Sequence, residues 1–308
     1  MRSYIIIITS ILLFSNQFTW AQQRPLQSLY MFDPLLMNPA YAGNQIQLST
    51  TAIYRNQWVN LDGAPKTFTA TAHTGFKKNR VGVGFILSND QIGIHNDVGF
   101  YGVYSYKISL TRKSTLAFGL QGGFNNLRSD YNKLIIKNSG DPNLGGVDTK
   151  MNPNFGAGLY FRKNNFYAGL SVPYILNNKV VGQEGIASFA KQKRYYYLMA
   201  GFTYKLSNRV KVVPSTLIRV QDSAPISFDL NTIFVLYDVV GLGCSYRLGD
   251  AVVTLFELQI NDNFHVGYAY DITTSALNQY SNGSHEIMIN YRVKIARLHK
   301  GLECPTYW

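Results

Sequence analysis

Short and long connections alternate along this chain, and this alternation limits the folds open to it. Tight turns are predicted at residues 77–80, 111–113, 162–165, 207–208, 237–238 and 261–263. Longer connections are predicted between them, at residues 55–66, 88–97, 127–150, 172–192 and 271–284. Outer-membrane barrels have short turns on the periplasmic side and longer loops on the outer side. The spacing therefore predicts an up-and-down barrel in which one rim carries the short turns and the other rim carries the long loops.

The segments between these connections alternate between apolar and polar or small residues. Leu116, Phe118 and Leu120, for example, are separated by Ala117 and Gly119. A period of two is typical of a strand whose two faces meet different surroundings. Aromatic residues near the turns suit a bilayer interface, and those on the apolar faces are Tyr104, Tyr106, Phe161, Phe166, Phe202, Tyr204, Tyr268 and Tyr270. A large soluble β-sandwich would show the same alternation and is the alternative fold.

The strand count supports a closed barrel. We expect about fourteen strands, an even number as in bacterial single-chain barrels. They are predicted at residues 44–54, 66–76, 79–88, 98–110, 113–126, 153–161, 165–172, 194–206, 209–219, 225–235, 239–248, 251–260, 263–270 and 284–294. Most reach the roughly 9–11 residues that a tilted membrane strand needs. The predicted fold is thus an all-β, up-and-down antiparallel barrel in an outer membrane.

The first residues have the pattern of a secretory signal peptide. Arg2 precedes an apolar stretch, and Thr19-Trp20-Ala21 ends in a small residue suited to cleavage. Because the rest of the chain alternates, no spanning helix is expected after export, which favours the outer membrane. We divide the chain into a signal peptide (1–21), a periplasmic N-terminal segment (22–43), a transmembrane barrel (44–294) and a C-terminal tail (295–308).

The chain is basic, with a formal net charge of +12. In an exported protein this charge favours anionic lipid headgroups or an acidic protein partner, and we expect no nucleic acid. Much of the charge lies in the short turns, at Lys77, Lys78, Arg80, Arg112, Lys113, Arg162 and Lys163. The alternative is that these turns are simply solvated.

No motif indicates catalysis, a cofactor or a metal, so we do not expect an enzyme. His285-Glu286 lacks the second histidine of a zinc-protease helix. Five ionisable residues can converge inside the barrel, where a structural network is a better interpretation than catalysis. They are His73, Arg219, Asp229, His265 and Glu286.

Several short runs occur in an order that resembles a known family. They include Asp-Pro-Leu-Leu-Met-Asn-Pro-Ala-Tyr-Ala-Gly at 33–43, Tyr-Arg-Asn-Gln-Trp at 54–58, Asn-Asp-Gln-Ile-Gly at 89–93 and Ser-His-Glu-Ile at 284–287. Together they resemble the PorP/SprF family of type IX secretion system membrane proteins, over residues 22–294. The resemblance implies a barrel that serves type IX secretion and contacts a periplasmic ring made of a lipoprotein and its partner. It also implies support for the export or surface attachment of cargo with a C-terminal signal domain, including gliding adhesins.

The matched runs supply candidates for partner contacts. These are Asn38, Pro39, Ala40, Tyr41, Gly43, Arg55, Gln57, Trp58, Asp90, Gly93, His285 and Glu286. Asn38-Pro39 and Gly43 are predicted to form a turn that leads into the first strand from the periplasmic side. Trp58 is either a rim anchor or cargo surface, or a residue that packs its own loop.

Three functions compete at this point. We favour a secretion component that acts by protein–protein contact, and the alternatives are a channel or transporter for small or apolar solutes and a soluble secreted adhesin. An even strand number places both chain ends on the periplasmic rim. Residues 22–43, the basic turns and the tail 295–308 would then share the rim that meets the secretion ring, while the outer loops face cargo. Membrane lipid is the remaining expected partner.

Overall fold

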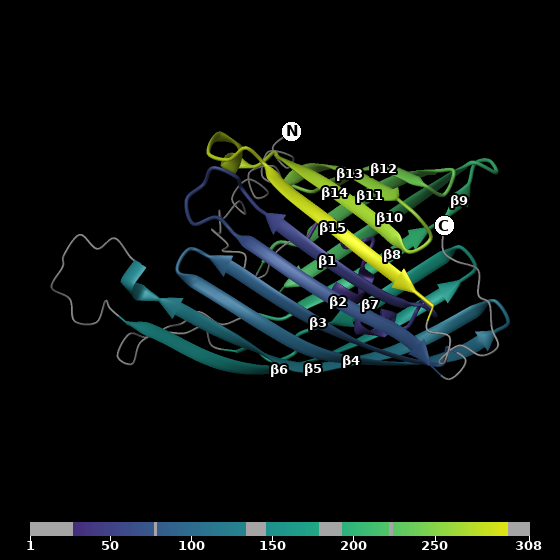
Figure 1. The fold of residues 1–308 in the computed structure, drawn as a ribbon, viewed down its shortest axis with the longest axis horizontal. Coiled ribbons are helices and arrows are strands. Elements are labelled where there is room, and N and C mark those ends of the chain that lie inside the picture. Colours follow the sequence, from purple (N-terminus) through teal and green to yellow (C-terminus); the bar gives the residue numbers. More distant parts are fainter. Residues whose placement is uncertain (1–26, 77–78, 134–145, 179–192, 222–223, 295–308) are drawn as a thin grey trace, which may run out of the picture.

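The protein is a single closed β-barrel in the computed structural model, which describes residues 27–76, 79–133, 146–178, 193–221 and 224–294. Its sheet contains 15 strand segments, and β10–β11 pairing closes the ring. Segments β8 and β9 both pair with β10 and are separated by Thr203 alone, so they form one interrupted strand. Fifteen segments less one give a barrel of fourteen strands, which confirms the predicted fold class (Figure 1).

All neighbouring strands are antiparallel, and successive strands are neighbours around the ring. The strands are β1 (Leu48–Asn56), β2 (Lys66–Phe76), β3 (Val81–Ile92), β4 (His95–Thr111), β5 (Ser114–Asp130), β6 (Val147–Lys163), β7 (Phe166–Val172), β8 (Tyr195–Phe202), β9 (Tyr204–Lys205), β10 (Val210–Gln221), β11 (Ser227–Leu236), β12 (Val240–Arg247), β13 (Ala251–Gln259), β14 (Phe264–Thr273) and β15 (Ser284–Val293). The other elements are short 3₁₀ helices, and none of the described helices is long and apolar enough to cross a membrane.

Two rims follow from this order. The short-turn rim holds the beginning of β1, the end of β15 and the turns after β2, β4, β6, β9, β11 and β13. The long-connection rim holds the connections after β1, β5, β7 and β14, together with shorter ones after β3, β10 and β12. Leu48 and Val293 pair with each other, so the first and last strands meet at the short-turn rim.

Two predicted long connections are shorter than expected because the strands beside them continue. Residues 88–97 lie almost entirely in β3 and β4, which pair as far as Ile92 and His95 around a turn with Gly93 at φ 55°. Likewise β5 and β6 remain paired out to Asp130 and Val147. Sequence alternation fades in these polar extensions, but their backbone groups still pair, since antiparallel pairing requires no apolar face.

The two faces of the wall have the predicted chemistry. Phe118 is 44% exposed on the outer face of β5, whereas Gln121 is 4% exposed and faces inward. Large apolar side chains are exposed around the outside on every long strand, among them Phe85, Tyr104, Leu120, Phe155, Leu198, Phe234 and Ile289. A continuous apolar exterior of this kind is the surface that a bilayer covers.

Phe118→Arg is expected to reduce the folded fraction of the protein in lipid. The outward apolar run on β5 extends from Leu116 to Phe124, so Phe118 lies well inside it. An arginine on the lipid face near the midplane costs about 2–4 kcal/mol. Urea titration in liposomes, read from the gel shift between boiled and unboiled protein, measures this loss. Phe118→Leu is the matched control, and equal midpoints for both variants would contradict the assigned outer face.

Candidate functional site within the barrel

The chain before the first strand runs through the inside of the barrel. Residues 27–43, here called the lumenal segment, form hydrogen bonds with strands all around the ring. Their partners are Glu286 on β15, Asp271 on β14, Thr69 on β2, Ser105 on β4, Leu159 on β6, Ser171 on β7 and Asn231 on β11. Only the lumen lies within reach of all these strands, so the segment lies inside the barrel (Figure 1).

Two 3₁₀ turns shape the lumenal segment. They are η1 (Pro34–Leu36) and η2 (Pro39–Tyr41), and each begins with a proline, whose fixed φ suits the first position of a helix. The Asn38 side chain accepts a hydrogen bond from the Ala40 backbone N–H at 2.9 Å and donates one to the Leu159 carbonyl at 2.8 Å. One side chain therefore both caps η2 and fastens it to the wall.

Glycines in the wall make room for this turn. A Cβ atom added at Gly119 would lie 2.0 Å from the Ala40 backbone nitrogen. Added at Gly158 it would lie 2.1 Å from Asn38 Oδ1, and at Gly82 it would lie 2.0 Å from the Ala42 carbonyl oxygen. Side chains at these inward positions would overlap the segment, so the wall and the segment are fitted to one another.

The end of the segment nearer the short-turn rim is held through its backbone. Ser105 donates to the Ala42 carbonyl at 2.6 Å, and Lys107 Nζ donates to the Gly43 carbonyl. The Gly43 N–H donates to His73 Nδ1 at 3.2 Å. The Tyr41 ring packs edge-on against His73, with ring centres 5.5 Å apart.

A buried charged cluster lies toward the long-connection rim. It consists of Arg55, Arg219, Arg247, Asp229, Asp271 and Glu286, whose side chains are each no more than 4% exposed. Three positive and three negative charges sum to zero, as a desolvated site requires. Arg55 contacts Asp271 at 2.6 Å and Glu286 at 2.8 Å. Asp229 contacts Arg219 at 2.9 Å and Arg247 at 3.3 Å, and Arg247 lies 3.6 Å from Asp271.

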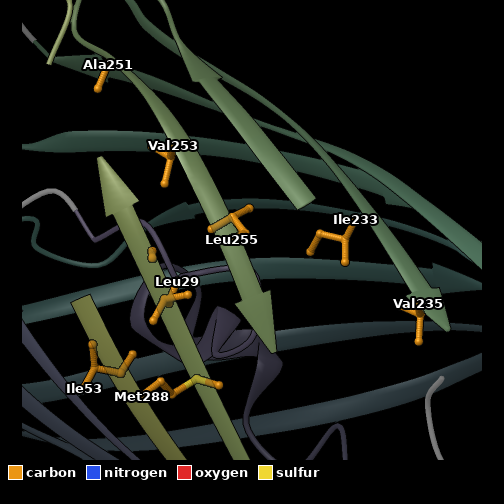
Figure 2. Packing of buried hydrophobic residues seen from close by; sticks show 9 residues of the cluster. Leu29, Ile53, Ile233, Val235, Ala251, Val253, Leu255 and Met288 are labelled. Atoms are coloured by element: carbon orange, nitrogen blue, oxygen red, sulfur yellow. The ribbon is translucent and has the colours of Figure 1, made fainter. Parts of the chain in front are cut away.

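The charged cluster binds the first described residues of the lumenal segment. The backbone N–H groups of Ser28 and Leu29 donate to the two oxygens of Glu286, at 2.8 and 2.9 Å. The Ser28 hydroxyl donates to Asp271 at 2.8 Å and accepts from Arg55 at 3.2 Å. Leu29 is fully buried against an apolar patch of the inner wall that includes Ile53, Val253 and Met288 (Figure 2).

This course corrects the predicted position of residues 27–43, while residues 22–26 lie outside the described residues. The sequence predicted a periplasmic segment that shares one rim with the C-terminal tail, but residues 27–43 lie in the lumen. Ser28 is held among strand residues next to the long-connection rim, whereas Gly43 lies near the short-turn rim. The segment thus runs the length of the barrel before β1 begins at Leu48. The tail at 295–308 lies outside the described residues.

The predicted contact residues fall into three groups. Asn38, Pro39, Ala40, Tyr41 and Gly43 form the lumenal turn, and Arg55 and Glu286 belong to the charged cluster. The other candidates lie around the long-connection rim, so the structure does not bring all twelve together.

Those rim candidates stabilise loops and strand ends. The backbone N–H of Trp58 donates to Ser284 Oγ at 3.1 Å, and Trp58 adopts a positive φ of 49°. Gln57 is buried next to Arg55, Asp90 accepts from Thr67 at 2.6 Å, and Gly93 forms its turn. His285 lies outside the lumen and contacts the Tyr268 hydroxyl at 2.7 Å.

The expected lumenal network is only partly the one observed. Asp229, Arg219 and Glu286 do belong to it, linked through Arg247 and Asp271. His73 instead binds Gly43, and His265 faces Glu257 at 3.5 Å. Sequence reasoning missed Arg247, Asp271 and Ser28. Asp271 was assigned to a loop because the predicted strand ended at residue 270, although β14 continues to Thr273.

Solved structures resemble this chain in fold. The CymD monoaromatic hydrocarbon channel has a TM-score of 0.51 at 11% identity, covering 89% of this chain and 94% of that one. Omp33, an outer membrane protein of Acinetobacter baumannii, has a TM-score of 0.47 at 8% identity over 80% and 98% of the two chains. The KdgM porin has 0.41 at 12% identity over 79% and 98%. No curated protein sequence matches the chain.

The family comparison is more specific. The model for the type IX secretion system membrane protein PorP/SprF matches residues 19–291, which include the lumenal segment and nearly the whole barrel. The match confirms the resemblance drawn from the sequence, and the barrel fold agrees with an outer-membrane location. The chain therefore belongs to the PorP/SprF family of type IX secretion system membrane proteins.

Proposed function

We propose that this protein supports type IX secretion by protein–protein contact, and not by passing solutes through its lumen. The observation that carries the proposal is the lumenal segment, which occupies the space a channel would need. Its backbone and side chains bond to seven strands, and its turn lies against wall glycines. With the interior occupied, the rims are the surfaces that remain for partners, and neither the family nor the fold points to an enzyme.

A sealed lumen gives a direct prediction. The purified mature protein, inserted in planar bilayers, is expected to show no steady porin-like conductance, since residues 27–43 block the path. A known open porin in the same bilayers is the positive control. Steady channels from correctly folded protein, together with uptake of small solutes by liposomes, would contradict the proposal and favour the alternative, a channel for small or apolar solutes.

The short-turn rim suits an acidic or polar partner. Arg80, Arg112, Lys113, Lys163 and Lys205 are exposed there, while Lys77 and Lys78 lie outside the described residues. If the short turns face the periplasm, as in outer-membrane barrels, this rim meets the secretion ring formed by a lipoprotein and its partner. The long-connection rim then faces cargo with a C-terminal signal domain, including gliding adhesins.

Reversing the basic rim is expected to weaken recovery of the periplasmic partner. Changing Arg112, Lys113, Lys163 and Lys205 to Glu alters the rim charge by eight units, and like charges slow encounter between the two proteins. We expect a loss of several-fold at low ionic strength. The difference should shrink toward 1 M salt, where the screening length is about 3 Å. Co-purification from native membranes at two salt concentrations measures both effects.

The matched control reverses exposed cations at the opposite rim. Lys66, Arg128 and Lys133 are exposed near the long-connection rim, and their change to Glu should leave the periplasmic partner bound. If both sets reduce recovery equally, or if neither set affects partner or cargo in a correctly inserted barrel, the assignment of partners to rims is wrong.

A further inference from the structure

The two ends of the lumenal segment are held by different chemistry. Toward the short-turn rim, Asn38 to Gly43 are enclosed by wall glycines and bonded through their backbone to Ser105, Lys107 and His73. Toward the long-connection rim, Ser28 and Leu29 bond only to the charged cluster and pack on one apolar patch. On either side of them, Gln27 donates to Thr69 at 2.8 Å, and the buried Tyr30 hydroxyl accepts from Asn231 at 2.6 Å. The first attachment therefore depends on shape, and the second depends on polar contacts and on the burial of Leu29 and Tyr30.

The charged cluster is paired without the lumenal segment. Each of its three arginines contacts a carboxylate of the wall, and each of its three carboxylates contacts a wall arginine. Ser28 and Leu29 add hydrogen bonds but no charge. Release of these residues therefore leaves no buried ion without a counter-ion, which is the costly outcome in a desolvated site.

Release of the other end would be far more disruptive. It would leave a cavity beside Gly119, Gly158 and Gly82, where residues 38–42 now touch the wall directly. It would also take the Gly43 carbonyl away from the ammonium group of Lys107, which is buried in the wall. Cavities and buried charges that lose a partner are both strongly destabilising.

We propose that the lumenal segment is a hinged strap: residues 27–32 leave the charged cluster while residues 38–43 stay fixed in the wall. The η1 turn between them is the hinge. Burial of Leu29 against Ile53, Val253 and Met288 (Figure 2), together with the hydrogen bond between Tyr30 and Asn231, keeps the strap closed at rest. In the open state, the long-connection end of the lumen becomes accessible, and the Glu286 and Asp271 carboxylates face water in place of Ser28 and Leu29.

Hydrogen exchange of the full mature protein in detergent tests the hinge directly. Amides in a peptide that covers residues 27–32 are expected to exchange at least tenfold faster than those in a peptide that covers 38–43, because only the first set opens locally. Equal rates at both ends would overturn the proposal, since the segment would then leave as one unit or not at all.

Two variants test which contacts hold residues 27–32 in place. Glu286→Gln replaces one of the two Glu286 oxygens that accept from the Ser28 and Leu29 N–H groups. Leu29→Asp alters the strap and leaves every wall residue unchanged. Each should accelerate exchange at least tenfold in residues 27–32 and leave 38–43 unchanged. Glu257→Gln is the control, because Glu257 is a buried wall carboxylate that faces His265. If Glu286→Gln does not fold, Leu29→Asp still decides: unchanged exchange in residues 27–32 would overturn the proposal.

Discussion

Arg55→Met is expected to lower the stability of the barrel by about 3–5 kcal/mol, the usual cost of removing one partner from a buried ion pair. Arg55 lies between Asp271 and Glu286, at 2.6 and 2.8 Å. Without it the charged cluster has two positive and three negative charges in a site with almost no solvent contact. Urea titration of the folded form in liposomes, compared with wild type, measures the loss.

A second variant separates charge from packing. Arg55→Met combined with Glu286→Gln restores an equal number of positive and negative charges, so the double variant should be more stable than Arg55→Met alone. Arg128→Met is the surface control, because Arg128 is exposed near the end of β5, and it should change stability by less than about 0.5 kcal/mol. A double variant that is less stable than Arg55→Met would mean that the charge balance of the cluster does not determine the loss.

The barrel itself was predictable from the sequence because each strand carries its own signal. Alternation places Phe118 outside and Gln121 inside without knowledge of any neighbour, and turn residues separate the strands. The errors occur where alternation fades. Polar residues such as Asn89 and Asn96 continue β3 and β4 through backbone pairing alone, and no apolar pattern marks them as strand.

The lumenal segment was not predictable in the same way. Its motif was recognised, but a run with two prolines and no period of two reads as a turn outside the barrel. Its position depends on contacts with Ser105, Ser171 and Glu286, which lie 63, 134 and 258 residues from their partners in the segment. Such distant pairings leave no local pattern in a single sequence. One signal was present: inward glycines such as Gly119 and Gly158 are expected where another part of the chain approaches a strand closely.

The charged cluster was predictable in part, unlike the barrel, which was predictable, and the lumenal segment, which was not. Alternation correctly placed Arg219, Asp229 and Glu286 on the inner face, because polar residues at inward positions are visible one strand at a time. Asp271 was lost through a strand end misplaced by three residues. The role of Ser28 could not be found from strand patterns, because it precedes the barrel and binds through a backbone N–H and a hydroxyl.

Gly119→Ala is expected to push the η2 turn away from β5 in a barrel that still folds. The new Cβ would lie 2.0 Å from the Ala40 nitrogen and 2.3 Å from the Pro39 carbonyl carbon, both backbone atoms that have no rotamer to move away. Either the η2 turn shifts or β5 does, and β5 is paired along both of its edges. Overpacking of this kind costs about 1–3 kcal/mol, and a local shift of the η2 turn away from β5 relieves it and loosens the fit that closes the lumen.

Gly102→Ala makes the comparison specific to the lumen. Gly102 lies opposite Gly122 in the β4–β5 pair, and its nearest neighbour for an added Cβ is 3.8 Å away. Both variants carry the same change from glycine to alanine in neighbouring strands, so differences in strand propensity largely cancel. Gly119→Ala should therefore show conductance in planar bilayers and a lower urea midpoint, while Gly102→Ala behaves like wild type. If both variants show no conductance and have equal urea midpoints, the η2 turn does not press against β5. The fit between segment and wall would then not be the reason the lumen is closed.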